Sequence, residues 1–436
     1  MDRVRRSTAW VAAASGMLGV LDLVSTLLCI RLWVTTADFG EATLAIALFP
    51  ILDRLGGMGF GAVLVREPGG GAKARQEHTL FWLNASAAGG VLVLAAGAYA
   101  ATRALVVALI VAYAVRLVIQ ASSVVPEARL RRALRFGELS AIRVIAGVAE
   151  TATKLTLAYL GAHGRPELRV WCFALGPVVN TAITTIALQL RCAWRPRLTF
   201  DRAFARQAMG FTAALSGGEL LYYAYTSADY LVIGAAFGTA AVGVYRLAYE
   251  LVLDVVRLIS MITAEVAYPV FVQTPRDALA AQFLRFSRQN MYVLVPFLGF
   301  VAVGGGWLLH LLYGPLPPEA AVAARILCVV GALRSLGFVI PPLLAALGHA
   351  SRVLAYNAVA AVVLPLAFVL AAHVGSDFTA VAWAWAFGYP IAFALLLAFA
   401  LVALPLRLRD YLRGLIASAS ATRAVPAPRT APPPGT

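Results

Sequence analysis

Long apolar stretches, separated by short polar or basic connections, follow one another along most of the 436-residue chain. A helix needs about 20 mainly apolar residues to cross a bilayer, and twelve stretches reach that length. The pattern therefore predicts an all-α, polytopic membrane protein with about twelve transmembrane helices. The predicted spans are residues 8–33, 41–65, 79–100, 103–125, 138–160, 169–190, 208–236, 241–266, 289–313, 319–346, 352–374 and 378–405.

The composition supports this class of protein and excludes a soluble globular domain. Hydrophobic residues make up 61% of the chain and charged residues only 13%, whereas soluble domains carry about 25% charged residues. The four cysteines are far apart, and no Cys-x-x-Cys motif or histidine cluster accompanies them. The sequence therefore predicts no metal site, no disulfide framework and no cofactor.

The net charge of +15 is explained by membrane orientation. If the N-terminus is cytoplasmic, 24 of the 36 Lys and Arg residues fall in cytoplasmic segments and only Arg103, Arg165 and Arg169 fall in the opposite connections. Basic residues are retained on the cytoplasmic side of membrane proteins. We therefore expect both termini in the cytoplasm, and nucleic-acid binding is not needed to account for the charge.

A weak internal repeat divides the spans into six plus six. When the sequence is shifted by 203 residues, the segment around Thr36 and Gly40 falls on the segment around Thr239 and Gly243, with further identities beyond them. Because six is an even number, the two halves have the same orientation in the membrane. This predicts two six-helix lobes related by a pseudo-twofold axis along the membrane normal, as in transporters with parallel repeats.

The repeat and the composition together predict three parts of the chain. Residues 1–205 form an N-terminal six-helix lobe and residues 206–405 a C-terminal six-helix lobe. Residues 406–436 are basic and then rich in proline and alanine. Such a composition cannot bury a core, so we expect a disordered cytoplasmic tail.

Several short motifs occur in a recognisable order within this frame. The order and spacing resemble those of the Wzx-type polysaccharide flippases of the MOP exporter superfamily, over nearly the whole chain up to about residue 405. The motifs are Ala37-Asp-Phe-Gly40, Met58-Gly-Phe-Gly61, Ser227-Ala-Asp-Tyr-Leu-Val-Ile-Gly234, Ala241-Val-Gly-Val-Tyr245, Ala267-Tyr-Pro-Val-Phe271, Leu312-Tyr-Gly314 and Ala346-Leu-Gly348.

The resemblance implies a MOP-like fold and a transport function without covalent catalysis. It implies that the protein moves an undecaprenyl-pyrophosphate-linked oligosaccharide from the inner to the outer leaflet of the bacterial inner membrane by alternating access. The product would enter O-antigen, capsule or exopolysaccharide assembly. A polymerase and a chain-length regulator of the same pathway are the partners that the resemblance implies, besides the membrane lipids.

Charged residues inside the predicted spans are the candidate site. Each costs about 2.5–3.5 kcal/mol at a membrane helix centre on insertion scales, so these residues must line a wet cavity, pair with one another or reach the interface. Arginine offers forked donors that suit phosphate oxygens. We predict a cationic substrate cavity, with interhelical pairing as the alternative for each member: Arg54, Arg143, Lys154, Arg257 and Arg334.

Two sets of charges have helical spacing that favours pairing within one helix. Glu150 and Lys154 are four residues apart in the fifth predicted span. Arg246, Glu250, Asp254 and Arg257 follow one face of the eighth. Residues three or four apart are neighbours on a helix surface, so these charges form either a structural ion-pair network or a polar face of the central cleft.

Two acids are candidates for coupling transport to an ion gradient. Asp22 lies in the middle of the first predicted span, and Asp229 lies in the Ala-Asp-Tyr motif of the seventh. A carboxylate in a dry site can exchange protons, although structural hydrogen bonding is the alternative for both. Tyrosines 222, 223, 225 and 230 and tryptophans 383 and 385 could offer faces to sugar rings or simply pack.

Other functions remain open at this point. A cation-coupled multidrug exporter of the same superfamily should have fewer intramembrane arginines and more acids, and a lipid II exporter carries two further spans. A membrane polysaccharide polymerase needs a catalytic constellation in a large external loop, and no predicted external loop is long enough. No catalytic residue is therefore assigned.

Overall fold

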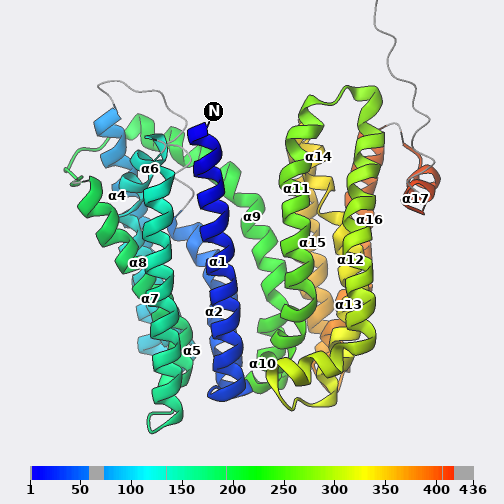
Figure 1. Ribbon diagram of the computed structural model, residues 1–436, viewed down its shortest axis with the longest axis horizontal. Helices are drawn as coiled ribbons and strands as arrows, with labels where there is room; N and C mark the ends of the chain where they lie inside the picture. The colour runs from blue at the N-terminus through cyan, green and yellow to red at the C-terminus, as the bar shows by residue number, and fades with distance from the viewer. Residues whose placement is uncertain (1, 58–72, 134, 193, 405, 417–436) are drawn as a thin grey trace, which may run out of the picture.

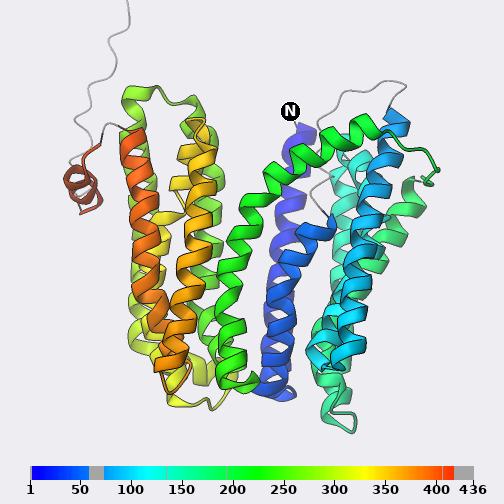
Figure 2. The ribbon, with the colours of Figure 1, turned by 180° about the vertical axis from the view of Figure 1, so that it is seen from behind.

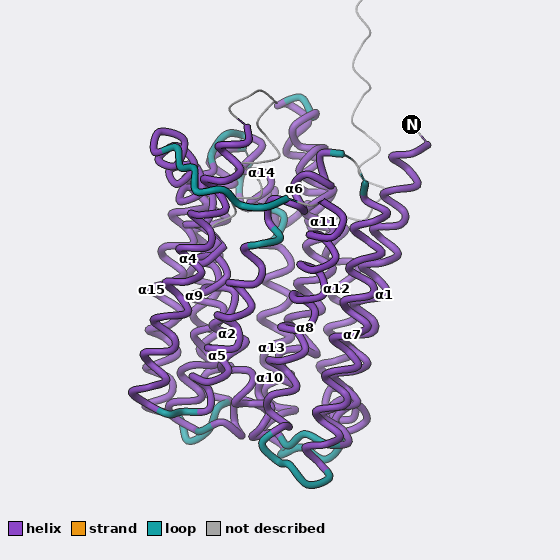
Figure 3. The backbone as a smooth tube through the Cα atoms, turned by 90° about the vertical axis from the view of Figure 1, so that its left-hand side faces the viewer, coloured by secondary structure: helices purple, strands orange, loops and turns teal. Residues whose placement is uncertain are grey.

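The computed structural model describes residues 2–57, 73–133, 135–192, 194–404 and 406–416. Within these ranges every regular element is a helix and none is a strand (Figure 3). Large apolar side chains such as Leu94, Val303 and Val374 are exposed on the outer faces of their helices. In a bilayer such faces contact lipid, so the prediction of an all-α, multi-pass membrane protein is confirmed.

The first half of the chain forms helices of 9 to 31 residues. They are α1 Asp2–Leu32, α2 Thr36–Gly57, α4 Lys73–Thr102, α5 Leu105–Ala121, α6 Val124–Arg132, α7 Phe136–Ala162 and α8 Leu168–Cys192. The Met58-Gly-Phe-Gly61 motif and the end of the second predicted span lie outside the described residues.

The second half contains the longest helix, α12, with 38 residues. Its elements are α9 Arg202–Phe237, α10 Thr239–Tyr249, η1 Glu250–Asp254, α11 Val255–Gln273, α12 Arg276–Tyr313, α13 Pro318–Gly337, α14 Ile340–Ala346, α15 Ala350–Val374, α16 Thr379–Ala403 and α17 Leu408–Ile416. The η1 segment is a π-helical turn that joins α10 to α11.

Within the described residues each predicted span lies on one helix or on consecutive helices, and the second span can be followed only as far as Gly57. By length and composition, seven helices in the described part can cross a membrane, or eight when α5 and α6, bent by 49°, count as one span. The number twelve therefore stays a prediction, and so do the lobe boundaries.

Figures 1 and 2 show two groups of helices side by side. The first group consists of α1, α2 and α4–α8, and the second of α11–α16. Helix α9 runs obliquely: it begins beside the first group and ends in the second, where α10 begins. Contacts of α2 with α9 and α10, and of α1 with α12, join the groups.

Glycines allow the closest of these contacts. A Cβ atom on Gly40 of α2 would lie 1.8 Å from the carbonyl oxygen of Thr239, and one on Gly243 of α10 would lie 1.9 Å from that of Thr36. Only glycine permits such backbone proximity. The 203-residue repeat relates Thr36 to Thr239 and Gly40 to Gly243, so it exchanges the first of these contacts with the second. This reciprocity agrees with the predicted pseudo-twofold arrangement.

The start of the predicted tail is ordered as a helix. Residues Leu408–Ile416 form α17, which packs on α12. The Tyr411 ring stacks on Phe283 with 5.5 Å between ring centroids. The prediction of a wholly disordered tail over residues 406–436 is thus wrong for α17, because Tyr411 and Leu415 find an apolar surface to cover. Residues 417–436 lie outside the described part.

Candidate functional site

Four of the five predicted site cations form ion pairs with carboxylates in the structure. Arg54 binds Glu219, Arg143 binds Glu127, Lys154 binds Asp22 and Arg257 binds Asp254. The five cations do not converge on a single described cavity. Among the five cations and their carboxylate partners, only Arg334 and Glu219 line one described cavity in common. Glu219 is the partner of Arg54.

The Arg54–Glu219 pair connects the two groups of helices. Arg54 lies in the last turn of α2, and its Nε atom is 2.9 Å from Oε2 of Glu219 on α9. Both side chains are partly accessible, at 30% and 48%. A charged ligand entering between α2 and α9 would therefore meet both partners.

Lys154 and Asp22, which the sequence assigned to different roles, form one pair. Lys154 Nζ on α7 donates to Asp22 Oδ1 on α1 at 2.5 Å and to Thr26 Oγ1 at 3.1 Å. The lysine side chain is 6% exposed, whereas that of Asp22 is 68% exposed. The predicted Glu150–Lys154 pair is wrong, since Glu150 instead accepts a hydrogen bond from Asn180 Nδ2 at 2.8 Å.

The predicted charge row of the eighth span is an ion-pair network. Arg246 lies 2.8 Å from Glu250 and 3.0 Å from Asp254, and Asp254 also lies 3.2 Å from Arg257. The helix widens to a π turn at Glu250–Asp254, and single π turns occur frequently at functional sites. The four side chains thus form an ion-pair network, and a role of this face in lining a central cleft stays a prediction.

Arg143 lines a small polar cavity within the first group. Its Nη2 atom is 2.9 Å from Glu127 Oε1. The cavity, of about 250 Å³, is surrounded mainly by hydroxyl, amide and charged groups. Among its lining residues are Arg116, Gln120, Ser123, Asn180, Thr181, Thr184 and Thr185.

Arg334 on α13 differs from the other four because it forms no ion pair with a described carboxylate. Its side chain is buried, with 4% exposed. Nη1 donates to the Tyr249 hydroxyl at 3.1 Å, and Nη2 donates to the Tyr222 hydroxyl at 3.5 Å. The guanidinium also lies 5.2 Å from the ring centroid of Trp385, a distance typical of cation–π contacts.

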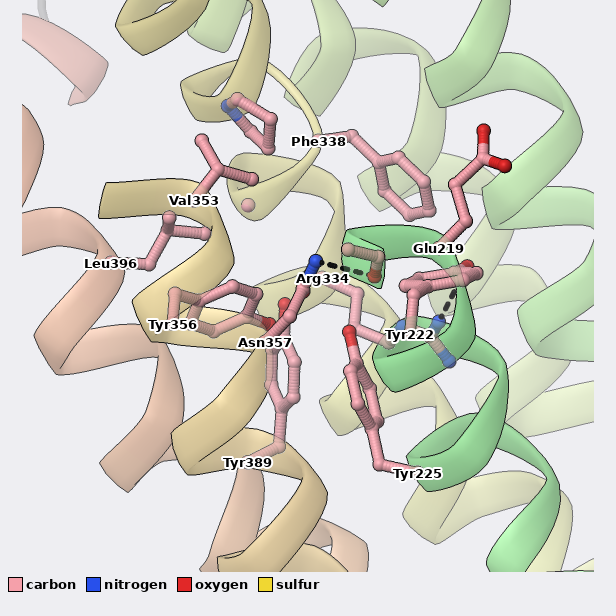
Figure 4. A pocket seen from close by; sticks show the side chains of 13 residues that line it. Glu219, Tyr222, Tyr225, Arg334, Phe338, Val353, Tyr356, Asn357, Tyr389 and Leu396 are labelled. Atoms are coloured by element: carbon pink, nitrogen blue, oxygen red, sulfur yellow. Dashed lines mark hydrogen bonds between the residues drawn. The ribbon is translucent and has the colours of Figure 1, made fainter. Parts of the chain in front are cut away.

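Arg334 and four tyrosines surround a chamber of about 300 Å³ (Figure 4). The hydroxyl-bearing walls come from helices far apart in the sequence. The main lining residues are Tyr222 and Tyr225 of α9, Arg334 of α13, Tyr356 and Asn357 of α15, and Tyr389 of α16. We call this the tyrosine chamber. Two charged residues line it: Arg334, which is buried, and Glu219, which is partly exposed and paired with Arg54.

Local sequence features open the chamber. Tyr222 and Tyr225 are three residues apart and so share a face of α9. Helix α13 ends at Gly337, and α14 begins with prolines 341 and 342 in its first turn, where a missing N–H is tolerated. A Cβ on Gly337 would lie 2.7 Å from the Tyr389 hydroxyl, so glycine is needed for this ring to reach the chamber.

Asp229 lies next to the chamber but is closed off from it. The residue is 0% exposed. Its carboxylate accepts hydrogen bonds from the Tyr245 hydroxyl at 3.0 Å, from Trp385 Nε1 at 2.9 Å and from the Tyr230 amide at 2.9 Å. Trp385 thus contacts both Asp229 and Arg334. The predicted coupling role of Asp229 stays a prediction.

Sequence reasoning missed three members of the site: Tyr356, Asn357 and Tyr389. Tyr356 and Asn357 are neighbours in the first turns of α15, and Tyr389 lies alone in the apolar α16. No local spacing connects any of them to Arg334. Of the two tryptophans that the sequence singled out, Trp385 packs beside the site, whereas Trp383 is 49% exposed. A polar side chain in the middle of an apolar span was the available signal.

The fold defines the class of the protein. Over 89% of this chain and 94% of the other, it superposes on the inward-facing conformation of a multidrug resistance MATE family transporter of the MOP superfamily, with a TM-score of 0.70 at 13% identity. The lipid II flippase MurJ in an inward closed conformation matches over 93% of this chain and 90% of the other, with a TM-score of 0.65 at 11% identity. The protein therefore has the fold of MOP-superfamily membrane transporters.

The family follows from the sequence. The family model described as "Polysaccharide biosynthesis protein" matches residues 30–316, and the chain belongs to this family. Two similar proteins are the teichuronic acid biosynthesis protein TuaB of Bacillus subtilis (27% identity over 75% of this chain and 68% of TuaB) and the lipopolysaccharide biosynthesis protein WzxC of Escherichia coli (26% over 77% and 68%). The amylovoran biosynthesis protein AmsL of Erwinia amylovora is 24% identical over 43% of this chain and 51% of its own length.

Proposed function

We propose that this protein is a flippase that carries an undecaprenyl-pyrophosphate-linked oligosaccharide across the inner membrane for assembly of a surface polysaccharide. Membership of the polysaccharide biosynthesis family and the MOP-superfamily fold support this proposal. The two helix groups would expose the substrate to each leaflet in turn. No covalent step is required of the protein.

The observation that carries the proposal is the sign of the charge in the tyrosine chamber. Arg334 is buried there and forms no ion pair with a described carboxylate. A buried guanidinium whose direct partners are tyrosine hydroxyls rather than a carboxylate can take an anionic ligand, since burying a charge without an ionic partner is costly.

The four paired cations complete the proposed site along the route. The Arg54–Glu219 and Arg257–Asp254 pairs are partly exposed, and exposed pairs contribute only about 0–1 kcal/mol. A pyrophosphate group can therefore exchange with their carboxylates at little cost. Arg143 and Lys154 would contribute positive charge within the first helix group.

We propose that Asp22 takes part in coupling through its pair with Lys154. A proton or cation bound at Asp22 would weaken the pair and leave the Lys154 ammonium free to attract the head group. Asp22 is accessible for this exchange, with 68% of its side chain exposed. Asp229 is the second proposed coupling acid and would require an opening of its hydrogen-bonded site.

The orientation and partners follow from the same proposal. The distribution of Lys and Arg supports the proposal that both termini lie in the cytoplasm. The flipped product would pass to a polymerase and a chain-length regulator on the outer side of the inner membrane.

Reconstitution tests the proposed function. Purified protein in proteoliposomes should transfer an undecaprenyl-pyrophosphate-linked oligosaccharide between leaflets, measured by its accessibility to an added glycosidase. Lipid II and a cationic dye serve as competing substrates. Transfer of either one without transfer of the oligosaccharide would replace the proposal by a lipid II or drug exporter. Polymer formation in the same vesicles would indicate a polymerase.

A further inference from the structure

A second cavity adjoins the tyrosine chamber on the side of α11 and α14. Its volume is about 660 Å³, roughly twice the 300 Å³ of the chamber. The two cavities adjoin each other, because four residues line both: Gly218, Pro341, Val353 and Asn357. We call the second cavity the apolar groove.

The groove differs chemically from the chamber. Its further lining residues are Met261, Ala264, Glu265, Tyr268, Pro342, Ala345, Ala350 and Leu354. Among them Glu265 is the sole charged residue, and it is exposed. Met261, Tyr268 and Leu354 are 46%, 47% and 44% exposed. The groove thus offers accessible apolar surface within the described part of the second helix group.

We propose that the chamber and the groove form one site for the junction between the anionic head and the hydrocarbon chain of the lipid-linked substrate. The phosphate next to the first sugar binds Arg334 in the chamber, and the first isoprenoid units lie in the groove. This inference rests on the proposed function and assigns α9 together with the second helix group as the place where the junction is held.

The chamber matches the polar side of this junction. The Arg334 guanidinium has forked donors that suit phosphate oxygens. The hydroxyls of Tyr222 and Tyr356 and the amide of Asn357 can exchange hydrogen bonds with sugar hydroxyls. The tyrosine rings supply apolar faces for the C–H side of a sugar ring. A volume of about 300 Å³ limits the chamber to a small part of an oligosaccharide.

The groove matches the hydrocarbon side. Isoprenoid carbon can pack against Met261, Ala264 and Leu354, where many weak dispersion contacts add up. The carboxylate of Glu265 repels a phosphate, which gives the site a direction: the anion goes to the Arg334 end and the hydrocarbon to the other. Neither cavity alone distinguishes a lipid-linked sugar from a free one.

Two probes test the site on purified protein in nanodiscs: a sugar pyrophosphate without lipid, and the same group on a chain of three isoprene units. The wild-type protein should bind the prenylated probe at least tenfold more tightly. Ala264→Trp and Ala345→Phe each fill the groove and should abolish this preference. Ile262→Trp is the matched control, since Ile262 is on the same helix, 60% exposed and outside the groove lining, and it should keep the preference.

The polar end is tested with the same probes. Arg334→Gln should weaken both probes at least tenfold and leave their ratio unchanged, whereas Arg325→Gln, an exposed position on the same helix, should change neither. Arg334→Lys keeps the positive charge but lacks the paired N–H donors of the guanidinium. It should bind both probes more tightly than Arg334→Gln and less tightly than the wild type.

Equal wild-type binding of the two probes, or a prenyl preference that survives both groove-filling variants, would overturn the inference and leave the flippase proposal intact. Failure of the wild-type protein to transfer the oligosaccharide in proteoliposomes would overturn the flippase proposal itself.

Discussion

Gly40 of α2 and Gly243 of α10 occupy equivalent places in the two halves of the chain. At each glycine the helix contacts the backbone of the other helix directly. Cβ atoms there would approach Thr239 and Thr36 to 1.8 and 1.9 Å. The contact is reciprocal, as across a twofold axis. It holds α2 against α10 at the end where Figure 1 shows the two helix groups meeting.

Replacement of either glycine should push the α2 and α10 backbones apart at this contact. Gly40→Val and Gly243→Val each force the backbones apart, and overpacking of this kind costs about 1–3 kcal/mol. We expect a lower unfolding temperature in detergent and a loss of oligosaccharide transfer. Gly97→Val on α4 is the control, because nothing lies within 4 Å of its Cβ position. Equal effects of all three variants would refute a special role of the contact.

Loss of the Arg54–Glu219 pair should lower transport activity strongly but change the free energy of unfolding only slightly. Arg54→Glu places two acids together between α2 and α9, so we expect transfer activity to fall at least tenfold. The free energy of unfolding should change by about 1 kcal/mol or less, because both side chains are partly exposed. The double variant Arg54→Glu with Glu219→Arg restores the pair. If it recovers no activity, the charge at position 54 itself is needed, rather than the link between the helices.

The Lys154–Asp22 pair should respond unequally to removal of its two partners. Asp22→Asn leaves a buried ammonium without its counter-ion, whereas Lys154→Met leaves a carboxylate that is already 68% exposed. Loss of one partner of a buried pair is strongly destabilising; the exposure of Asp22 reduces this to about 1–3 kcal/mol for Asp22→Asn. Lys154→Met should cost less. Thermal unfolding measures both, and the opposite order would contradict the assigned burial.

Asp229→Asn tests the second proposed coupling acid. In the wild type, Trp385 Nε1 and the Tyr245 hydroxyl both donate to Oδ2 of Asp229, and the Tyr230 amide donates to Oδ1. Asparagine keeps only one acceptor oxygen, so its NH2 group faces at least one of these donors. An unsatisfied buried donor costs about 1–3 kcal/mol, so we expect a lower unfolding temperature. Uptake driven by an imposed proton or sodium gradient is the functional measurement. Unchanged gradient dependence would remove Asp229 from the coupling mechanism.

The positions of the helices could be predicted from the sequence, and so could the resemblance to a family. An apolar segment in a bilayer must satisfy its backbone hydrogen bonds within itself, so each stretch such as 169–190 or 352–374 becomes a helix, as α8 and α15 do. The repeat around Gly40 and Gly243 could also be predicted, because it is visible as identical residues in the two halves of the sequence. Pairing within one helix was predicted correctly for Arg246 and Glu250 but not for Glu150 and Lys154.

Only the tertiary structure decided how charges on different helices combine. Lys154 pairs with Asp22 of α1 and not with Glu150 on its own helix, and Arg334 has tyrosines instead of an acid around it. The reason is physical: a helix surface brings residues three or four apart together by its own geometry, whereas the neighbour across an interface depends on how whole helices cross. The sequence determines which helices form and which charges need a partner, and the packing of the helices determines which partner each charge finds.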